Sequence, residues 1–263
     1  MDLGIHGKVA LVAASSKGLG RAVAEELAAE GVNLVLCARG EDTLRSTAEA
    51  IRQHTTVKVI DVAADISKPA DAERVVKAAF DEFGRVDILV NNSGGPPSAP
   101  FESITAEMWQ SATQLLLNSV VDLTRAVLPG MKERRWGRIL NVTSIAAKQP
   151  IEGLMLSNSL RAAVIGFART LANEVAPFGI TVNNLLPGYT KTDRVRQLAA
   201  GAGKNPKGSG GDVYAKWERE IPMGRLAEPR EFAALAAFLA SERASYITGS
   251  SIAADGGWIR SLL

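Results

Sequence analysis

Cysteine is almost absent from this sequence: Cys37 is the only one among 263 residues. A single cysteine cannot form a disulfide bond within the chain, so packing and hydrogen bonding must hold the fold. Cys37 lies in the apolar stretch VNLVLCA, which predicts a buried strand residue in a reducing, cytoplasmic compartment. The first residues, MDLGIHGKVALVAASS, contain no charged segment followed by an apolar run and a cleavage site, so we expect no signal peptide.

The sequence also lacks a strong charge of one sign and long apolar runs. Its formal net charge is +2, and the densest basic cluster, KERRWGR at residues 132–138, is interpreted as a solvated helix end. We therefore expect no nucleic-acid partner. No segment reaches 18 consecutive apolar residues, so no membrane span is expected. Histidine is scarce as well, with two residues, and we expect no metal site.

What the sequence does contain is a series of short apolar runs rich in Val, Ile and Leu. Most are continuous rather than alternating, which is typical of strands buried on both faces. Helical patterns such as GLGRAVAEELAAEG and DAERVVKAAFDEFG lie between them. This alternation predicts an α/β fold, with a single doubly wound parallel sheet, helices on both faces and one domain over residues 1–263. The predicted strands lie at 8–14, 32–38, 57–63, 86–92, 137–143, 180–186 and 250–256.

One segment, about residues 193–222, departs from this alternation. It contains the glycine-rich stretch AAGAGKNPKGSGGD and shows no apolar period. Because it follows a predicted strand end, it is interpreted as a flexible substrate-loop insertion that could act as a lid.

The first predicted strand runs into AASSKGLGRA, where glycines open a helix. Missing side chains let a diphosphate approach the backbone, and the helix N-terminus offers free N–H groups to it. Glycines at this place can also be plain turn residues. The expected cofactor contacts here are Ser15, Ser16, Lys17, Gly18, Leu19 and Gly20.

Arg39 follows the end of the second predicted strand, where an acidic residue would hold a ribose 2′-hydroxyl. An arginine suits a 2′-phosphate instead, and Lys17 adds positive charge beside the same place. A solvated strand end is the alternative reading of Arg39. The pair favours NADP(H) over NAD(H) as the cofactor.

The order of several short motifs resembles the short-chain dehydrogenase/reductase family, in the branch of the 3-oxoacyl-carrier-protein reductases. These motifs are SSKGLG, ADIS, NNSG, LNSV, NVTS, LPGYTKTD and YITGSSIAADGG. The resemblance implies a Rossmann-type fold, an oxidoreductase acting on a small carbonyl or hydroxy substrate, and a homo-oligomer, commonly a tetramer. It further implies cofactor contacts at Asp65, Ile66, Asn91, Ser93, Gly94, Pro187, Gly188, Thr190 and Thr192. Asp65 could instead cap the following helix, and Asn91 with Asn92 could tie neighbouring strands together.

The family resemblance fails at the catalytic residues. Asn118 and Ser144 match the Asn and Ser of the family's Asn-Ser-Tyr-Lys set, but Ser157 and Arg161 occupy the Tyr and Lys positions. The glycine-rich turn also departs from the family at Ala13 and Ala14, which replace Thr-Gly. Alanine is tolerated there if its φ stays negative.

These substitutions remove the usual proton donor for carbonyl reduction. A serine hydroxyl is a far weaker acid than a tyrosine, and arginine stays protonated, so it is a poor proton relay. Tyr189, Lys148 and Tyr214 are candidate replacements, and each can equally be a packing or surface residue. Arg161 could hold ribose hydroxyls, anchor an anionic substrate through a two-pronged contact, or turn to solvent. Two functions remain open: an atypical NADP(H)-dependent oxidoreductase, and a cofactor-binding sensor or partner subunit without ordinary carbonyl chemistry.

Overall fold

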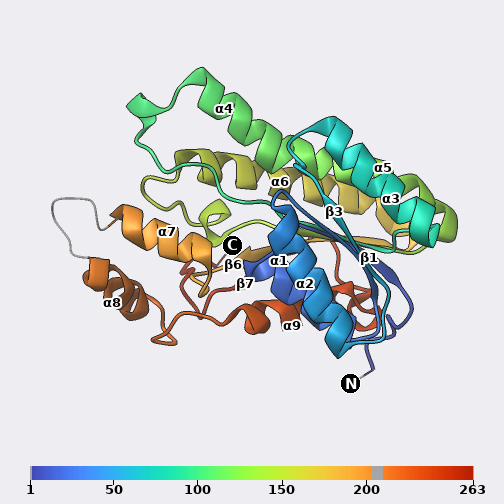
Figure 1. Ribbon diagram of the computed structural model, residues 1–263. Coiled ribbons are helices and arrows are strands. Elements are labelled where there is room, and N and C mark those ends of the chain that lie inside the picture. Colours follow the sequence, from blue (N-terminus) through green and yellow to red (C-terminus); the bar gives the residue numbers. More distant parts are fainter. Residues whose placement is uncertain (1, 203–209, 263) are drawn as a thin grey trace.

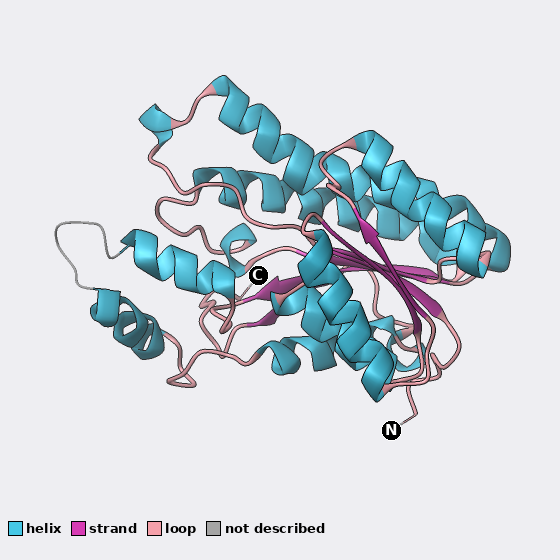
Figure 2. Cartoon of the chain, in the orientation of Figure 1, coloured by secondary structure: helices cyan, strands magenta, loops and turns pink. Residues whose placement is uncertain are grey.

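The protein is built around one parallel sheet of seven strands (Figures 1 and 2). The structure is a computed structural model, and it describes residues 2–202 and 210–262. The strands lie in the order β3-β2-β1-β4-β5-β6-β7, and every neighbouring pair is parallel. They are β1 (Val9–Ala13), β2 (Asn33–Ala38), β3 (Val59–Ala63), β4 (Ile88–Asn91), β5 (Gly137–Val142), β6 (Ile180–Pro187) and β7 (Ser251–Ala254). All seven predicted strands are therefore confirmed.

Helices cover both faces of the sheet, as Figure 1 shows. One core contains side chains from α1 (Gly18–Ala29), α2 (Glu41–His54) and α9 (Pro229–Ala240). The opposite core contains side chains from α3 (Pro69–Phe83), α5 (Ser119–Arg134) and α6 (Met155–Val175). The continuous apolar runs of the strands follow from this arrangement, because each central strand must bury both of its faces. Cys37 is fully buried in β2, as predicted.

The helix that precedes β5 is interrupted. A short helix, α4 (Ala106–Thr113), leads into a π-helical turn over Gln114–Asn118, and α5 continues from there. A π-helical turn contains more residues than an α-helical one, so it rotates the side chains that precede it relative to those that follow.

The segment 193–222 is not the irregular loop that the sequence predicts. It contains α7 (Asp193–Ala202) and α8 (Gly210–Glu220), which extend beyond the sheet in Figure 1. Val195 and Ala199 on α7, and Trp217 with Ile221 near the end of α8, are buried in a third apolar cluster. Each pair is spaced by four residues, which is one helical turn, so two short amphipathic helices fit better than a loop. Residues 203–209, which make up half of the glycine-rich stretch, lie outside the described residues.

Among the helices within residues 2–202 and 210–262, none combines the length and the apolar character needed to cross a membrane.

Candidate functional site

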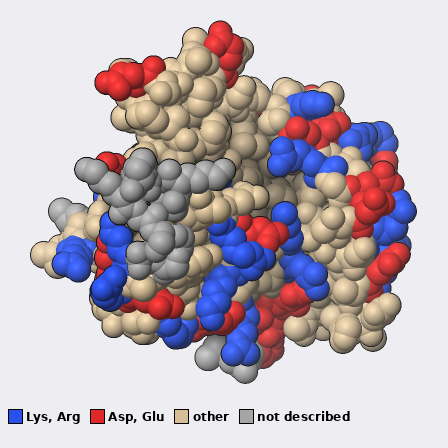
Figure 3. Space-filling view, turned by 60° about the vertical axis from the view of Figure 1, so that its left-hand side comes forward, with Lys and Arg blue, Asp and Glu red and all other residues tan. Residues whose placement is uncertain are grey.

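A large open cleft lies beyond the carboxyl ends of the strands, where β1 and β4 diverge in the strand order. This is the place where open parallel sheets usually bind ligands. The residues that follow β1, β2, β4, β5 and β6 form its floor, and α6, α7 and α8 form one side. Six basic and four acidic residues line it, and Figure 3 shows Lys and Arg side chains gathered near the middle of the corresponding face.

The glycine-rich turn presents the N-terminus of α1 to this cleft. Lys17, the residue before α1, makes no capping hydrogen bond with its side chain, and the first turn contains no acid. The free N–H groups of a helix start therefore face the cleft without a competing carboxylate from the first turn of the helix, which suits an anionic diphosphate. Gly18 lines the cleft and has a φ of +61°, a conformation that glycine adopts at little cost.

Gly20 does not line the cleft, although the sequence predicts a cofactor contact there. Its role is to let α1 approach the end of β1: a Cβ at this position would lie 2.4 Å from the carbonyl oxygen of Ala14 and 2.8 Å from the Asn92 amide nitrogen. Both distances are far shorter than normal contacts. The glycine is therefore required for packing the turn, and only indirectly for a ligand.

Ala14 does not meet the condition under which alanine is tolerated in this turn, which is a negative φ. Its φ is +49°, in the left-handed region that residues with a Cβ rarely adopt. The neighbouring Ala13 is an ordinary buried residue of β1. The turn has kept the backbone shape that a glycine would supply and accepts local strain at Ala14.

Replacing Ala14 by glycine is expected to stabilise the protein. Relief of the left-handed strain is worth about 1–2 kcal/mol, and the extra freedom of glycine in the unfolded chain costs about 0.5–1 kcal/mol. The net gain in the free energy of unfolding is up to about 1 kcal/mol, measurable by urea denaturation. Ala13→Gly is the matched control and should destabilise, since its φ is unstrained and its methyl group is buried. Loss of stability in both variants would contradict this interpretation of Ala14.

Most of the predicted site residues do come together in the cleft. The sequence-predicted residues that line it are Ser16, Lys17, Gly18, Leu19, Arg39, Asp65, Ile66, Ser93, Gly94, Ser144, Ser157, Arg161, Pro187, Gly188, Thr190 and Thr192. Arg39 is exposed at the end of β2 and forms no ion pair with any described side chain, whereas Lys17 pairs with Asp193 at 3.1 Å. The hydrogen bond from Lys17 holds the pKa of Asp193 below its usual range.

The predicted cofactor contact at Asn91 is corrected by the structure. Its amide lies inside the sheet rather than in the cleft, donating 2.9 Å to Oδ1 of Asn141 on β5. Asn141 in turn donates 3.1 Å to Asn184 on β6, and Asn184 donates 3.1 Å to Oγ of Ser251 on β7. These residues occupy matching positions in the parallel register, so the amides form a ladder across four strands. The strand-tying alternative is therefore confirmed for Asn91.

The predicted cofactor contact at Ser15 is corrected as well, because Ser15 is fully buried and donates a long hydrogen bond of 3.4 Å to the carbonyl of Cys37. Its hydroxyl ties the turn to β2 and does not line the cleft.

Asn118, assigned from the sequence as the catalytic asparagine, does not face the cleft either. Its side chain is exposed and donates 2.8 Å to Oε1 of Gln114, one turn earlier. The π-helical turn directs other side chains inward: Leu115 lines the cleft, and Leu116 is buried behind Ser93 and Arg161. No amide from this turn reaches the place where the sequence predicts one.

Ser157 and Arg161 lie one turn apart on α6 and contact each other. Nε of Arg161 donates 3.3 Å to Oγ of Ser157, while its two terminal nitrogens donate to the carbonyls of Val142 and Gly94 at 2.9 and 3.4 Å. Desolvation, reinforced by the charge of Arg194, lowers the pKa of Arg161 to about 10. The guanidinium is thus held in the cleft by neutral oxygens, and the reading of Arg161 as a side chain turned to solvent is wrong.

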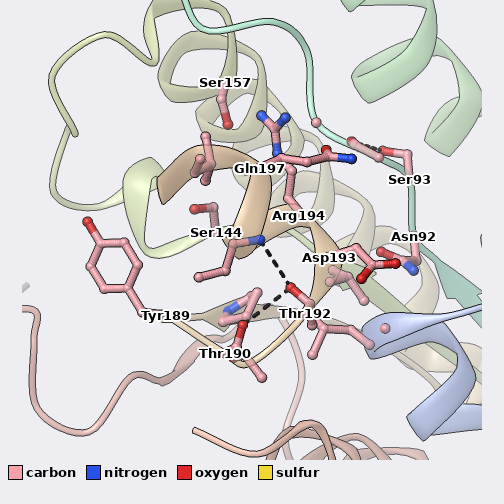
Figure 4. Close-up of a pocket in the computed structure, with 18 of the residues that line it drawn as sticks. Asn92, Ser93, Ser144, Ser157, Tyr189, Thr190, Thr192, Asp193, Arg194 and Gln197 are labelled. Carbon is pink, nitrogen blue, oxygen red and sulfur yellow. Dashed lines mark hydrogen bonds between the residues drawn. The ribbon is translucent and has the colours of Figure 1, made fainter. Parts of the chain in front are cut away.

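Ser144 also lines the cleft, where its hydroxyl accepts a 3.1 Å hydrogen bond from the N–H of Ala146. Figure 4 shows Ser144 and Ser157 on one side of the cavity, with Tyr189 and Arg194 reaching it from the segment after β6. Hydroxyl and guanidinium groups are therefore among the side chains at this end of the cleft.

Arg194 was not predicted as a site residue, because the segment that carries it lacks a clear sequence pattern. Arg194 lies in the first turn of α7 and donates 2.8 Å to the carbonyl of Pro96. Its guanidinium packs against the backbone of Gly95, where a Cβ would approach within 2.5 Å. Burial lowers the pKa of Arg194 below its ordinary value.

An aromatic wall closes the cleft beside these arginines. Tyr189 stacks on Trp217 with ring centroids 4.4 Å apart, and meets Trp258 edge-on at 6.1 Å. Burial, with a smaller contribution from Glu220, raises the pKa of Tyr189 to about 12. Of the three candidate proton donors only Tyr189 lines the cleft, since neither Lys148 nor Tyr214 does. The two tryptophans were not singled out from the sequence, although tryptophan occurs four times in the chain.

No group of three or more His, Cys, Asp or Glu side chains able to hold a metal ion occurs in the part of the chain that the structure describes.

Comparison with known proteins places this architecture in a family. A family model described as enoyl-(acyl carrier protein) reductase matches residues 13–259. The chain belongs to the short-chain dehydrogenase/reductase family. A 3-oxoacyl-[acyl-carrier-protein] reductase, FabG of Vibrio cholerae, is 37% identical over 255 residues, which cover 97% of this chain and 98% of the relative.

Solved structures of other family members superimpose closely. L-sorbose reductase from Gluconobacter frateurii, in complex with NADPH and L-sorbose, matches with a TM-score of 0.94 at 37% identity and full coverage of both chains. YwfH, an NADPH-dependent reductase involved in bacilysin biosynthesis, matches with a TM-score of 0.93 at 33% identity, covering 97% of this chain and all of that one. The predicted family and Rossmann-type fold are thus confirmed.

Proposed function

We propose that this protein is an atypical short-chain dehydrogenase/reductase, an NADPH-dependent oxidoreductase of the 3-oxoacyl-carrier-protein reductase type acting on a carbonyl or hydroxyl group. The observation that carries the proposal is the uncapped N-terminus of α1 in the cleft, with Lys17 and Arg39 beside it. Relatives with 36–37% identity are 3-oxoacyl reductases, and the superimposable sorbose reductase binds NADPH.

The residues present fit this cofactor. The turn at Gly18 would hold the diphosphate, Lys17 and Arg39 the 2′-phosphate, and Asp65 with Ile66 the adenine. Further along the cleft, the nicotinamide end would contact Ser93, Gly94, Pro187, Gly188, Thr190 and Thr192. Bound there, NADPH supplies a hydride, and the chain must orient the substrate and handle the accompanying proton.

Proton transfer is where this site is atypical. Ser157 and Arg161 can orient an oxygen by hydrogen bonding, but neither is an efficient acid near neutral pH. Tyr189 contains an ionisable phenol, yet burial weakens it as an acid. We therefore propose that the protein reduces ordinary ketones slowly. The second candidate function is a cofactor-binding sensor or partner subunit, which the lack of an efficient acid among Ser157, Arg161 and Tyr189 favours. The homotetramer expected from the family stays a prediction.

NADPH is expected to bind at least tenfold more tightly than NADH. One charge-assisted contact to the 2′-phosphate contributes roughly 1.5–3 kcal/mol, and 1.4 kcal/mol corresponds to tenfold. Arg39→Ala should remove most of the preference, because Arg39 has no ion-pair partner to lose among the described side chains. Lys17→Ala should have a smaller effect, because Lys17 must first leave Asp193.

Fluorescence titration of the protein and both variants with each cofactor measures these affinities. Arg45→Ala is a suitable control, since Arg45 is exposed on α2 and pairs with Glu41 outside the cleft. Equal affinities for NADPH and NADH, or an unchanged ratio in Arg39→Ala, would reject the assignment of the 2′-phosphate site. Failure of both cofactors to bind would reject the proposed function itself.

A further inference from the structure

We propose that the substrate of this site is an organic acid, whose carboxylate is held by Arg161 and Arg194 while its apolar part lies against Tyr189, Trp217 and Trp258. This inference rests on the proposed function and specifies its substrate class. It follows from three observations: two guanidinium groups that share one end of the cleft, the lack of an ion-paired acid for them among the described side chains, and the aromatic wall beside them.

The two guanidinium groups lie against consecutive residues after β4: Arg161 donates 3.4 Å to the carbonyl of Gly94, and Arg194 packs against Gly95. The charge of Arg194 accordingly contributes to lowering the pKa of Arg161. The two arginines come from different elements, Arg161 from α6 and Arg194 from α7. Like charges repel, so such an arrangement costs free energy in the absence of a ligand. Two converging guanidinium groups form a site that suits a planar carboxylate, which accepts paired hydrogen bonds from arginine.

No carboxylate among the described side chains forms an ion pair with either arginine. Four acids line the same cleft, namely Asp65, Glu152, Asp193 and Glu220. Within the described side chains, none of these acids nor any other forms an ion pair with Arg161 or Arg194. Asp193 is engaged by Lys17 and Arg196, and Asp65 accepts hydrogen bonds from Ser67.

The acceptors that the two arginines do have are neutral. Arg161 donates to Val142, Gly94 and Ser157, and Arg194 to Pro96. These bonds fix the guanidinium groups in place but do not balance their charge. Desolvated cations are usually paired with an anion, so the structure leaves a place for an anionic ligand.

Apolar side chains form a further part of this end of the cleft. Tyr189, Trp217 and Trp258 share a cluster with Ile151 and Leu198, and all five line the cleft. Aromatic faces contribute much of the binding energy of an apolar ligand. A carboxylate beside an aryl or branched group therefore fits both the charge and the apolar surface.

Benzoylformate and its methyl ester are the probes that test this inference. They share the phenyl ring and the ketone and differ in the negative charge. Calorimetric titration into the NADP⁺ complex should show the acid binding at least tenfold more tightly than the ester. Arg161→Gln and Arg194→Gln should each reduce or abolish this difference. Arg169→Gln, which removes an exposed arginine of α6 outside the cleft, should leave the difference intact.

Several outcomes would overturn the inference. Equal affinities for acid and ester, a difference that survives both glutamine variants, or no binding of the acid would each do so. A loss of NADP⁺ affinity in Arg161→Gln or Arg194→Gln would instead assign the pair to a cofactor phosphate. If NADP⁺ does not bind at all, the proposed function fails, and the same two titrations into the cofactor-free protein still test the arginine pair.

Discussion

Ser157→Tyr combined with Arg161→Lys is expected to raise NADPH-dependent reduction of a small activated, uncharged ketone by about 10²–10⁴, the usual contribution of a general acid. The two positions are one helical turn apart and their side chains already touch, at 3.3 Å between Nε of Arg161 and Oγ of Ser157. A lysine at position 161 can lower the pKa of a tyrosine at position 157, so that the tyrosine donates a proton to the substrate. Neither Ser157 nor Arg161 can supply that proton as efficiently. Initial rates of NADPH oxidation measure the gain.

The single changes are expected to do much less, because the two groups act as a unit. Ser157 is buried and its pocket must accept a larger ring, so Ser157→Tyr alone also reports the cost of crowding. Asn118→Ala tests whether Asn118 is a catalytic residue, as the sequence motif predicted. Since Asn118 is exposed and faces away from the cleft, its removal should leave the rate of the double variant unchanged.

Turnover of such ketones by the unmodified protein at ordinary enzyme rates, of order 10 s⁻¹, would contradict this account. Tyr189 would then be the proton donor to test, because it is the remaining candidate phenol that lines the cleft. Tyr189→Phe would abolish that activity while keeping the stacking against Trp217.

The sheet was predictable because its central strands are buried on both faces, which leaves continuous apolar runs in the sequence. The glycine-rich turn was equally clear, since a strand end and a helix start flank it. Asn118 was misplaced because a motif does not reveal the π-helical turn that rotates Leu115 toward the cleft instead.

Other parts of the site depend on contacts between residues far apart in the chain. Asn91 belongs to an amide ladder that only the register of β4 with β5 brings together. Arg194 enters the cleft because α7 packs through Val195 and Ala199, and two apolar residues in a polar segment give a weak helical signal. The pairing of Arg194 with Arg161, on which the substrate inference rests, was therefore invisible in the sequence.

The contact between α1 and the end of β1 leaves no room for a side chain. A Cβ at Gly20 would lie 2.4 Å from a backbone carbonyl, that of Ala14, and backbone yields less readily than a flexible side chain. Ala14 is already held at a φ of +49°, so it cannot easily move away. The same turn presents Gly18 and the N-terminus of α1 to the cleft, which couples this packing contact to cofactor binding.

Gly20→Ala is accordingly expected to lower stability and cofactor affinity together. Overpacking of this kind costs about 1–3 kcal/mol, which for a chain of this size lowers the melting temperature by roughly 3–10 °C. The displaced turn should weaken NADPH binding at least tenfold, as measured by fluorescence titration below the transition. Glu25→Ala, an exposed change on the same helix, should alter stability by no more than about 0.5 kcal/mol and leave the affinity unchanged. An unchanged affinity in Gly20→Ala would show that the start of α1 binds its ligand independently of how the helix packs against β1.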